Sequence, residues 1–349
     1  MNNYEFMFGL AAPLLTLLVW GVKTLPAERW QILAAVPIKA DDYGGWKGLN
    51  LTFYGFFVSL STTFGVALTI VLLTSVGTPL FLVAGLIVIM LAICVPASKI
   101  VARLVEKKRN TFTIAGAGFV AAMVLPPGLL LVQRALARWA AITIHVLPVL
   151  AAVAITYALS ESIARLACLS FGCCYGKPLR QTNGIVGRMF GRFPAVFYGE
   201  TKKVAYESSL AGEPLIPVQA ITSVLFLAVG LAGLWLFLAS HWRLAALVPI
   251  FATWGWRAVS ESLRADHRGH SRISVYRVIS VIAIFYLVAM ISFLPSEGPT
   301  PNIAAGLSQV TSAAVIVGIE ALWLLVFLYY GRSRVTASVL SFHVVEDRV

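Results

Sequence analysis

Long apolar segments follow one another along the chain, separated by shorter polar segments. A helix needs about 20 mostly apolar residues to cross a hydrocarbon core about 30 Å thick. The strands of a membrane barrel are about half that length and alternate in polarity, so they do not explain such runs. Runs of the helical kind lie at residues 5–22, 50–74, 79–103, 112–133, 140–160, 216–239, 244–262, 275–293 and 309–330. We therefore predict an all-α polytopic membrane protein with about nine transmembrane helices.

Composition agrees with this fold class. Hydrophobic residues make up 59% of the 349 residues and charged residues only 12%, and the mean hydropathy is +0.86. A soluble domain carries about 25% charged residues. The first apolar run follows Met1-Asn-Asn-Tyr-Glu5, which lacks the positive charges that open a signal peptide. We therefore expect the first helix to be retained as a span.

The basic residues are unequally divided between the two sides expected for the bundle. One side receives 24 of the 27 Lys and Arg residues, and the other receives only Arg134, Arg138 and Arg243. The basic side holds 23–48, the end of the 79–103 run, 161–215, 257–277 and the tail. The positive-inside rule places this side, with the C-terminus, in the cytoplasm. The net charge of +12 indicates anionic lipid rather than nucleic acid as the partner.

One candidate site is the segment Arg165-Leu-Ala-Cys-Leu-Ser-Phe-Gly-Cys-Cys-Tyr-Gly-Lys-Pro178, at the end of the fifth run. An arginine at membrane depth is costly unless it is paired or binds an anion. The simpler interpretation is an arginine that extends to the membrane interface. The three cysteines of this segment, together with Cys94, do not form a disulfide or tetrahedral zinc pattern. We interpret them as packing residues and predict no metal site and no cofactor.

A second candidate site is the segment Trp254-Gly-Trp-Arg-Ala-Val-Ser-Glu-Ser-Leu-Arg264. Arg257, Glu261 and Arg264 are spaced at i, i+4 and i+7, which places them on one helix face. A carboxylate in this position orients a guanidinium group for bidentate phosphate binding. The alternative is a charge pair that seals a helix end. A third segment, at Tyr54-Gly55, is by itself typical of an interfacial aromatic residue.

In this order, the three segments resemble the prolipoprotein diacylglyceryl transferase family. Tyr54-Gly55 matches the Tyr-Gly pair that opens the family core, and Arg165 to Gly176 aligns without a gap to its signature in the Gly-Cys-Cys-Tyr-Gly form. Pro217-Val-Gln219 matches a later Pro-x-Gln. Gly255, Arg257, Glu261 and Arg264 match the helix after it, and Ile273 to Arg277 matches loosely a segment that opens the last core helix. The resemblance implies a seven-helix core at 50–293 with a 161–215 head loop. It makes 1–49 an added helix and connecting loop, and 294–349 an added helix and tail.

The resemblance implies transfer of diacylglyceryl from phosphatidylglycerol or a similar anionic phospholipid to an acceptor. Arg165 and Arg257 would hold the phosphodiester, and Glu261 would orient Arg257. The implied lipid-binding residues are Tyr54, Gly172, Gly176, Lys177, Gln219 and Arg264. The sequence departs from the family at Thr111 to Gly118, where the family has a histidine, and at Cys168 and Cys173, where it has asparagine and glutamate. The acceptor is therefore unknown and need not be a lipoprotein cysteine.

A proton acceptor for this chemistry could come from His267 and His270, although histidines in such a loop are more often solvated. Family members act on the outer face of the cytoplasmic membrane, whereas the charge count places these segments inside. An added first helix would invert everything after it, which leads us to the hypothesis of an inverted relative. The alternative is that the basic residues bind anionic lipid and that the orientation follows the family. Two other functions stay open: a lipid transporter or scramblase, and an assembly subunit with a vestigial site. Buried charges that serve no purpose are costly, which argues against the assembly subunit.

Overall fold

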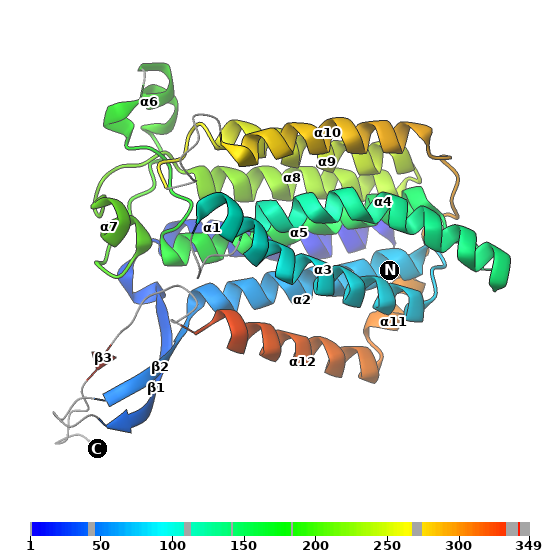
Figure 1. The fold of residues 1–349 in the computed structure, drawn as a ribbon, viewed down its shortest axis with the longest axis horizontal. Helices are drawn as coiled ribbons and strands as arrows, with labels where there is room; N and C mark the ends of the chain where they lie inside the picture. Colours follow the sequence, from blue (N-terminus) through cyan, green and yellow to red (C-terminus); the bar gives the residue numbers. More distant parts are fainter. Residues whose placement is uncertain are drawn as a thin grey trace.

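The structure is a computed structural model that describes residues 2–40, 46–107, 113–140, 142–182, 184–266, 274–332 and 341–342. It is mainly helical (Figure 1). The long helices are α1 (Asn3–Thr24), α2 (Phe53–Ser75), α3 (Leu80–Glu106), α4 (Ile114–Trp139), α5 (Val146–Phe171), α8 (Val218–Leu238), α9 (Trp242–Ser260), α10 (Val275–Phe293) and α12 (Ala313–Tyr330). The short helices are α6 (Gly184–Phe190), α7 (Lys203–Ser208), α11 (Ile303–Val310), and the 3₁₀ turns η1 (Glu28–Trp30) and η2 (Leu179–Gln181).

Within the described residues, eight helices are long and apolar enough to cross a membrane. They are α1, α2, α3, α4, α5, α8, α10 and α12. The ninth predicted run, 244–262, corresponds to α9, which is not among the eight, because its two arginines and three tryptophans lower its hydropathy. It nevertheless packs against α5, α8 and α10. The prediction of a polytopic helical membrane protein is thus confirmed, but the count of nine spans is not.

Successive long helices reverse direction, so their connections alternate between the two ends of the bundle (Figure 1). One end gathers the segment after α1, the connections α3–α4, α5–α8 and α9–α10, and the chain after α12. We call it the loop-rich end; it lies on the left in Figure 1. These are the segments that the charge count assigned to one side. The arrangement agrees with that grouping.

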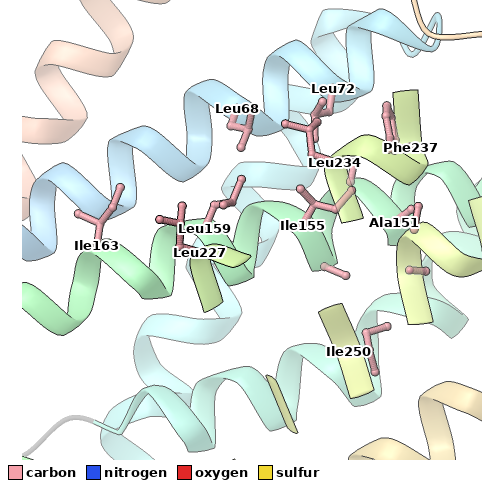
Figure 2. Packing of buried hydrophobic residues seen from close by; sticks show 14 of the residues in the cluster. Leu68, Leu72, Ala151, Ile155, Leu159, Ile163, Leu227, Leu234, Phe237 and Ile250 are labelled. Atoms are coloured by element: carbon pink, nitrogen blue, oxygen red, sulfur yellow. The ribbon is translucent and has the colours of Figure 1, made fainter. Parts of the chain in front are cut away.

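Helix α5 lies at the centre of the bundle and packs against α2, α8 and α9 (Figure 2). Leu159 and Ile155 are completely buried in this core. At Gly230, in α8, an added Cβ would lie 2.6 Å from the Leu159 side chain. The missing side chain therefore allows the close helix approach that small residues provide in membrane bundles.

One predicted boundary is wrong, and one predicted loop contains regular structure. Residues 161–171 belong to α5, so the predicted 161–215 head loop begins only at Gly172. The connecting loop predicted within 1–49 instead holds β1 (Ile32–Ala40) and most of β2 (Trp46–Thr52), an antiparallel hairpin that β3 (Ser341–Phe342) extends. At the end of β2, the Thr52 hydroxyl accepts a hydrogen bond from the Gly55 amide at 3.3 Å and so caps α2.

Candidate functional site

A cavity of about 660 Å³ opens between α2, α3, α4, α5 and α12 at the loop-rich end. Its apolar lining residues include Val58, Leu91, Val95 and Val326. Its charged lining residues are four cations, Arg165, Lys203, Arg257 and Arg264, and four acids, Glu106, Glu161, Glu207 and Asp266. An apolar chamber with a few convergent polar groups is the usual form of a small-molecule site.

Two of the predicted arginines meet on one carboxylate in this cavity. Arg165 forms an ion pair with Glu161, one turn earlier in α5. The Nη2 atom of Arg257, from α9, lies 3.4 Å from the same Oε1 atom of Glu161. The Arg257 side chain is 11% exposed and the Glu161 side chain is 4% exposed, so solvent screens this cluster weakly. Two guanidinium groups and one carboxylate leave a formal charge of +1.

Further hydrogen bonds fix part of this cluster. Nη2 of Arg257 donates to the Tyr157 hydroxyl at 2.5 Å. Tyr157 and Glu161 are four residues apart on α5, so both side chains face α9. The buried Nε of Arg165 has no hydrogen-bond partner in the described part of the chain. A buried unpaired donor in a cavity wall is a group that a ligand acceptor can satisfy.

The predicted contact between Glu261 and Arg257 is replaced by others. Helix α9 ends at Ser260, and the Glu261 carboxylate lies 3.8 Å from Nη1 of Arg264 and accepts from the Ser274 hydroxyl at 2.7 Å. The carboxylate beside Arg257 is Glu161. The i, i+4 rule holds only inside a continuous helix, and the chain turns at this point.

Arg264 pairs with a carboxylate other than Glu161. Its Nε and Nη2 atoms donate to the two carboxylate oxygens of Asp266, each at 2.7 Å. Burial alone lowers the pKa of Arg264, but the neighbouring Asp266 charge outweighs it and keeps that pKa well above its ordinary value. Arg264 therefore lines the cavity as part of a closed ion pair.

The Gly-Cys-Cys-Tyr-Gly segment makes a sharp turn after α5. Gly172 ends the helix with φ +72°, a conformation that glycine adopts without strain. Gly176 then pairs with the backbone of Arg264, and an added Cβ there would overlap the Ile216 carbonyl group. Backbone geometry explains the glycine at 172, and close contact with the Ile216 backbone within the chain explains the glycine at 176.

The other predicted binding residues are distributed unevenly. Tyr54 lines the cavity, with its ring 5.6 Å from that of Phe171. Gln219 is buried and its Nε2 donates to the Cys173 carbonyl at 2.9 Å, so it supports the turn. Its Oε1 has no partner in the described residues. Lys177 is exposed and is not among the described lining residues.

His267 and His270 lie outside the described residues, so the structure does not place the predicted proton acceptors. In the segment where the family has its histidine, Thr113 caps α4 through its hydroxyl and lines the cavity. The sequence interpretation missed Glu161, Tyr157 and Asp266. The spacing of Glu161 to Arg165 was available as a signal, because it is the same i, i+4 spacing that was assigned to Arg257 and Glu261.

The chain matches no protein-family model, no curated protein and no solved structure. The resemblance to the diacylglyceryl transferases therefore stays a prediction based on the order and content of the motifs.

Proposed function

We propose that the protein is a phospholipid-dependent transferase that moves a diacylglyceryl group from phosphatidylglycerol or a similar anionic phospholipid to an acceptor. The observation that carries the proposal is the meeting of Arg165 and Arg257 on Glu161 in the wall of a cavity between apolar helices. The excess charge of +1 matches the single negative charge of a phosphodiester. The apolar wall suits the acyl chains of the same molecule.

In the proposed reaction, the bond between the glycerol C3 of the diacylglyceryl group and the phosphate oxygen breaks, and a bond from C3 to the acceptor atom forms. The acceptor loses a proton to a base, for which His267 and His270 are the candidates from the sequence. Negative charge grows on the leaving glycerol phosphate, and the guanidinium groups of Arg165 and Arg257 stabilise it. Glu161 keeps both groups aligned before the lipid binds.

The proposal assigns supporting roles to other residues. Tyr54 would contact the lipid from the cavity wall, and Gln219 would hold the turn at Cys173. Gly172 and Gly176 would shape that turn, and the Arg264–Asp266 pair would close the cavity at the loop-rich end. Glu261, in turn, would position Arg264 rather than Arg257. Lys177, at the exposed surface, would contact anionic headgroups around the protein.

The proposal further takes α9 as a ninth span, α2 to α10 as the seven-helix core, and α1 and α12 as additions. Following the positive-inside rule, it places the loop-rich end of this multi-pass inner-membrane protein in the cytoplasm. Fusing a reporter that is active only in the cytoplasm to the C-terminus tests the orientation. An inactive C-terminal reporter, with an active one at the N-terminus, contradicts it.

The test of the activity is release of labelled glycerol phosphate from phosphatidylglycerol by purified protein, with membrane extract as the source of acceptor. Arg257→Ala and Arg165→Ala should each lower the rate on the order of 10²–10³-fold. Arg257→Lys keeps the charge but loses the planar fork, and it should also lose most of the activity. Arg277→Ala is the matched control, because Arg277 is exposed in α10 outside the cavity. Lipid movement between leaflets without any release would refute the transferase and favour a transporter or scramblase.

A further inference from the structure

The three cysteines of the turn after α5 converge on one point in the cavity wall. Their sulfur atoms all lie within 4.8 Å of one another, and Sγ of Cys168 lies 3.8 Å from Sγ of Cys174. Cys168 comes from the last turn of α5. Gly172 then reverses the chain, and Cys174 has a positive φ of 57° that turns its backbone again.

The sulfur spacing fits a metal ion with short metal–sulfur bonds. In a tetrahedral zinc site each Zn–S bond is about 2.3 Å, which places two ligand sulfurs about 3.8 Å apart. The distance between Cys168 and Cys174 has this value without any rearrangement, and the limit of 4.8 Å leaves Cys173 within a small shift of it. Thiolate is a soft ligand that binds zinc in preference to magnesium, which favours carboxylate ligands.

The surroundings differ from those of cysteines that only fill space. All three line the cavity, and Cys173 and Cys174 are half-buried, so an ion and a fourth ligand can reach them. The Nη1 atom of Arg165 lies 3.9 Å from Sγ of Cys168. Lys203 and Arg264 line the same cavity, each paired with an acid, Glu207 and Asp266 respectively. Three thiolates and one Zn²⁺ have a net charge of −1, which the neighbouring Arg165 guanidinium stabilises.

We propose that Cys168, Cys173 and Cys174 bind one Zn²⁺ ion through three thiolates, with the fourth coordination position facing the cavity. Binding releases three protons, one from each thiol, so that Zn²⁺ and three thiols give a three-thiolate zinc centre of charge −1 and three protons. Three protein ligands with an open fourth position are the arrangement of catalytic rather than structural zinc sites. The inference stands on the thiol geometry and is independent of the proposed transfer reaction.

The test uses tag-free, full-length protein in detergent, reduced and stripped with a chelator, and then supplied with Zn²⁺ alone. We expect one zinc per chain after excess metal is removed. Cys168→Ser, Cys173→Ser and Cys174→Ser should each weaken zinc binding by more than the roughly 10–100-fold lost when an outer-shell group is removed. Cys94→Ser is the matched control, because Cys94 lines the same cavity but lies outside the sulfur cluster.

Replacing Zn²⁺ with Co²⁺ in the unmutated protein gives a readout that does not depend on the folding of a variant. Thiolate-to-cobalt charge-transfer absorption with the intensity of three thiolates supports the site. A reduced protein that holds no zinc, or zinc binding that Cys94→Ser lowers as much as Cys174→Ser, overturns the proposal. A cobalt spectrum without thiolate bands overturns it as well.

Discussion

The carboxylate of Glu161 is shared by two buried guanidinium groups, and Glu161→Gln removes its charge while keeping its size. The Nη2 atom of Arg257 lies 3.4 Å from Oε1 of Glu161. At an effective dielectric constant of about 20, this pair contributes about 5 kcal/mol of Coulomb attraction. Removing one partner of a buried ion pair costs about 3–5 kcal/mol, because the other charge stays buried. We expect Glu161→Gln to lower the free energy of unfolding by this amount.

Thermal unfolding of the purified protein in a neutral detergent measures the effect. Taking roughly 2 °C per kcal/mol, the lower end of the range for domains of 150–250 residues, the loss corresponds to a fall in Tm of roughly 6–10 °C. Glu213→Gln is the matched control. Glu213 pairs with Arg180 at 3.6 Å, but the two side chains are 35% and 64% exposed, so the loss should stay below about 1 kcal/mol. Equal Tm values for the two variants would refute the reasoning.

The same variant links stability to the proposed ligand. A phosphodiester between Arg165 and Arg257 would replace the lost carboxylate charge, so phosphatidylglycerol should raise the Tm of Glu161→Gln more than that of the unmutated protein. Diacylglycerol has the same acyl chains and no phosphate, and it should not restore the Tm. Equal stabilisation of both proteins by phosphatidylglycerol would show that the phosphate does not bind at this cluster.

Three further predictions concern the loop-rich end. In thermal unfolding, Gly176→Ala should destabilise the protein by about 1–3 kcal/mol, because the added methyl group meets the Ile216 carbonyl. Gly255 has open space around it in α9, so the Gly255→Ala control should be neutral or stabilising. Burial lowers the pKa of Lys202 to about 8, so between pH 8 and 10.5 the unfolded chain binds more protons than the folded protein. The free energy of unfolding should therefore rise on the order of 3 kcal/mol over this pH range. The Lys202→Met variant should lack that rise, and an equal rise in the variant would contradict this origin. Tyr276→Phe should cost about 1–3 kcal/mol, because the buried Glu106 carboxylate loses a 2.8 Å hydrogen bond, and an unchanged Tm would contradict it.

The spans were predictable because hydropathy and length set them locally. The predicted span at 275–293 coincides residue for residue with the observed helix α10. The end of α5 was not predictable in this way, because Glu161 and Arg165 interrupt the apolar run while pairing with each other inside the helix. The hairpin of β1 and β2 was missed because its pairing is a contact between segments rather than a local pattern.

Several residues that line the cavity could be singled out in the sequence, but their pairing could not be predicted. Arg165 was recognised from its cost at membrane depth and Arg257 from its helical spacing to Glu261 and Arg264, and the structure brings the two arginines to one cavity. The partner of Arg257 lies 96 residues earlier in the chain, and no local spacing indicates such a contact. The three cysteines were interpreted as packing residues, and the convergence of their thiols was not predicted for a related reason. A C-x₄-C-C spacing forms a cluster only because the chain reverses at Gly172 and turns again at Cys174.

Direct binding of phosphatidylglycerol tests the central claim most directly, because it depends on neither the acceptor nor the base. Delipidated protein is titrated with a labelled short-chain phosphatidylglycerol, alongside Arg257→Ala and the Arg277→Ala control. We predict one lipid bound per chain, an affinity at least about tenfold weaker in Arg257→Ala and unchanged in Arg277→Ala, and no competition by diacylglycerol. The same affinity in all three proteins would contradict the account.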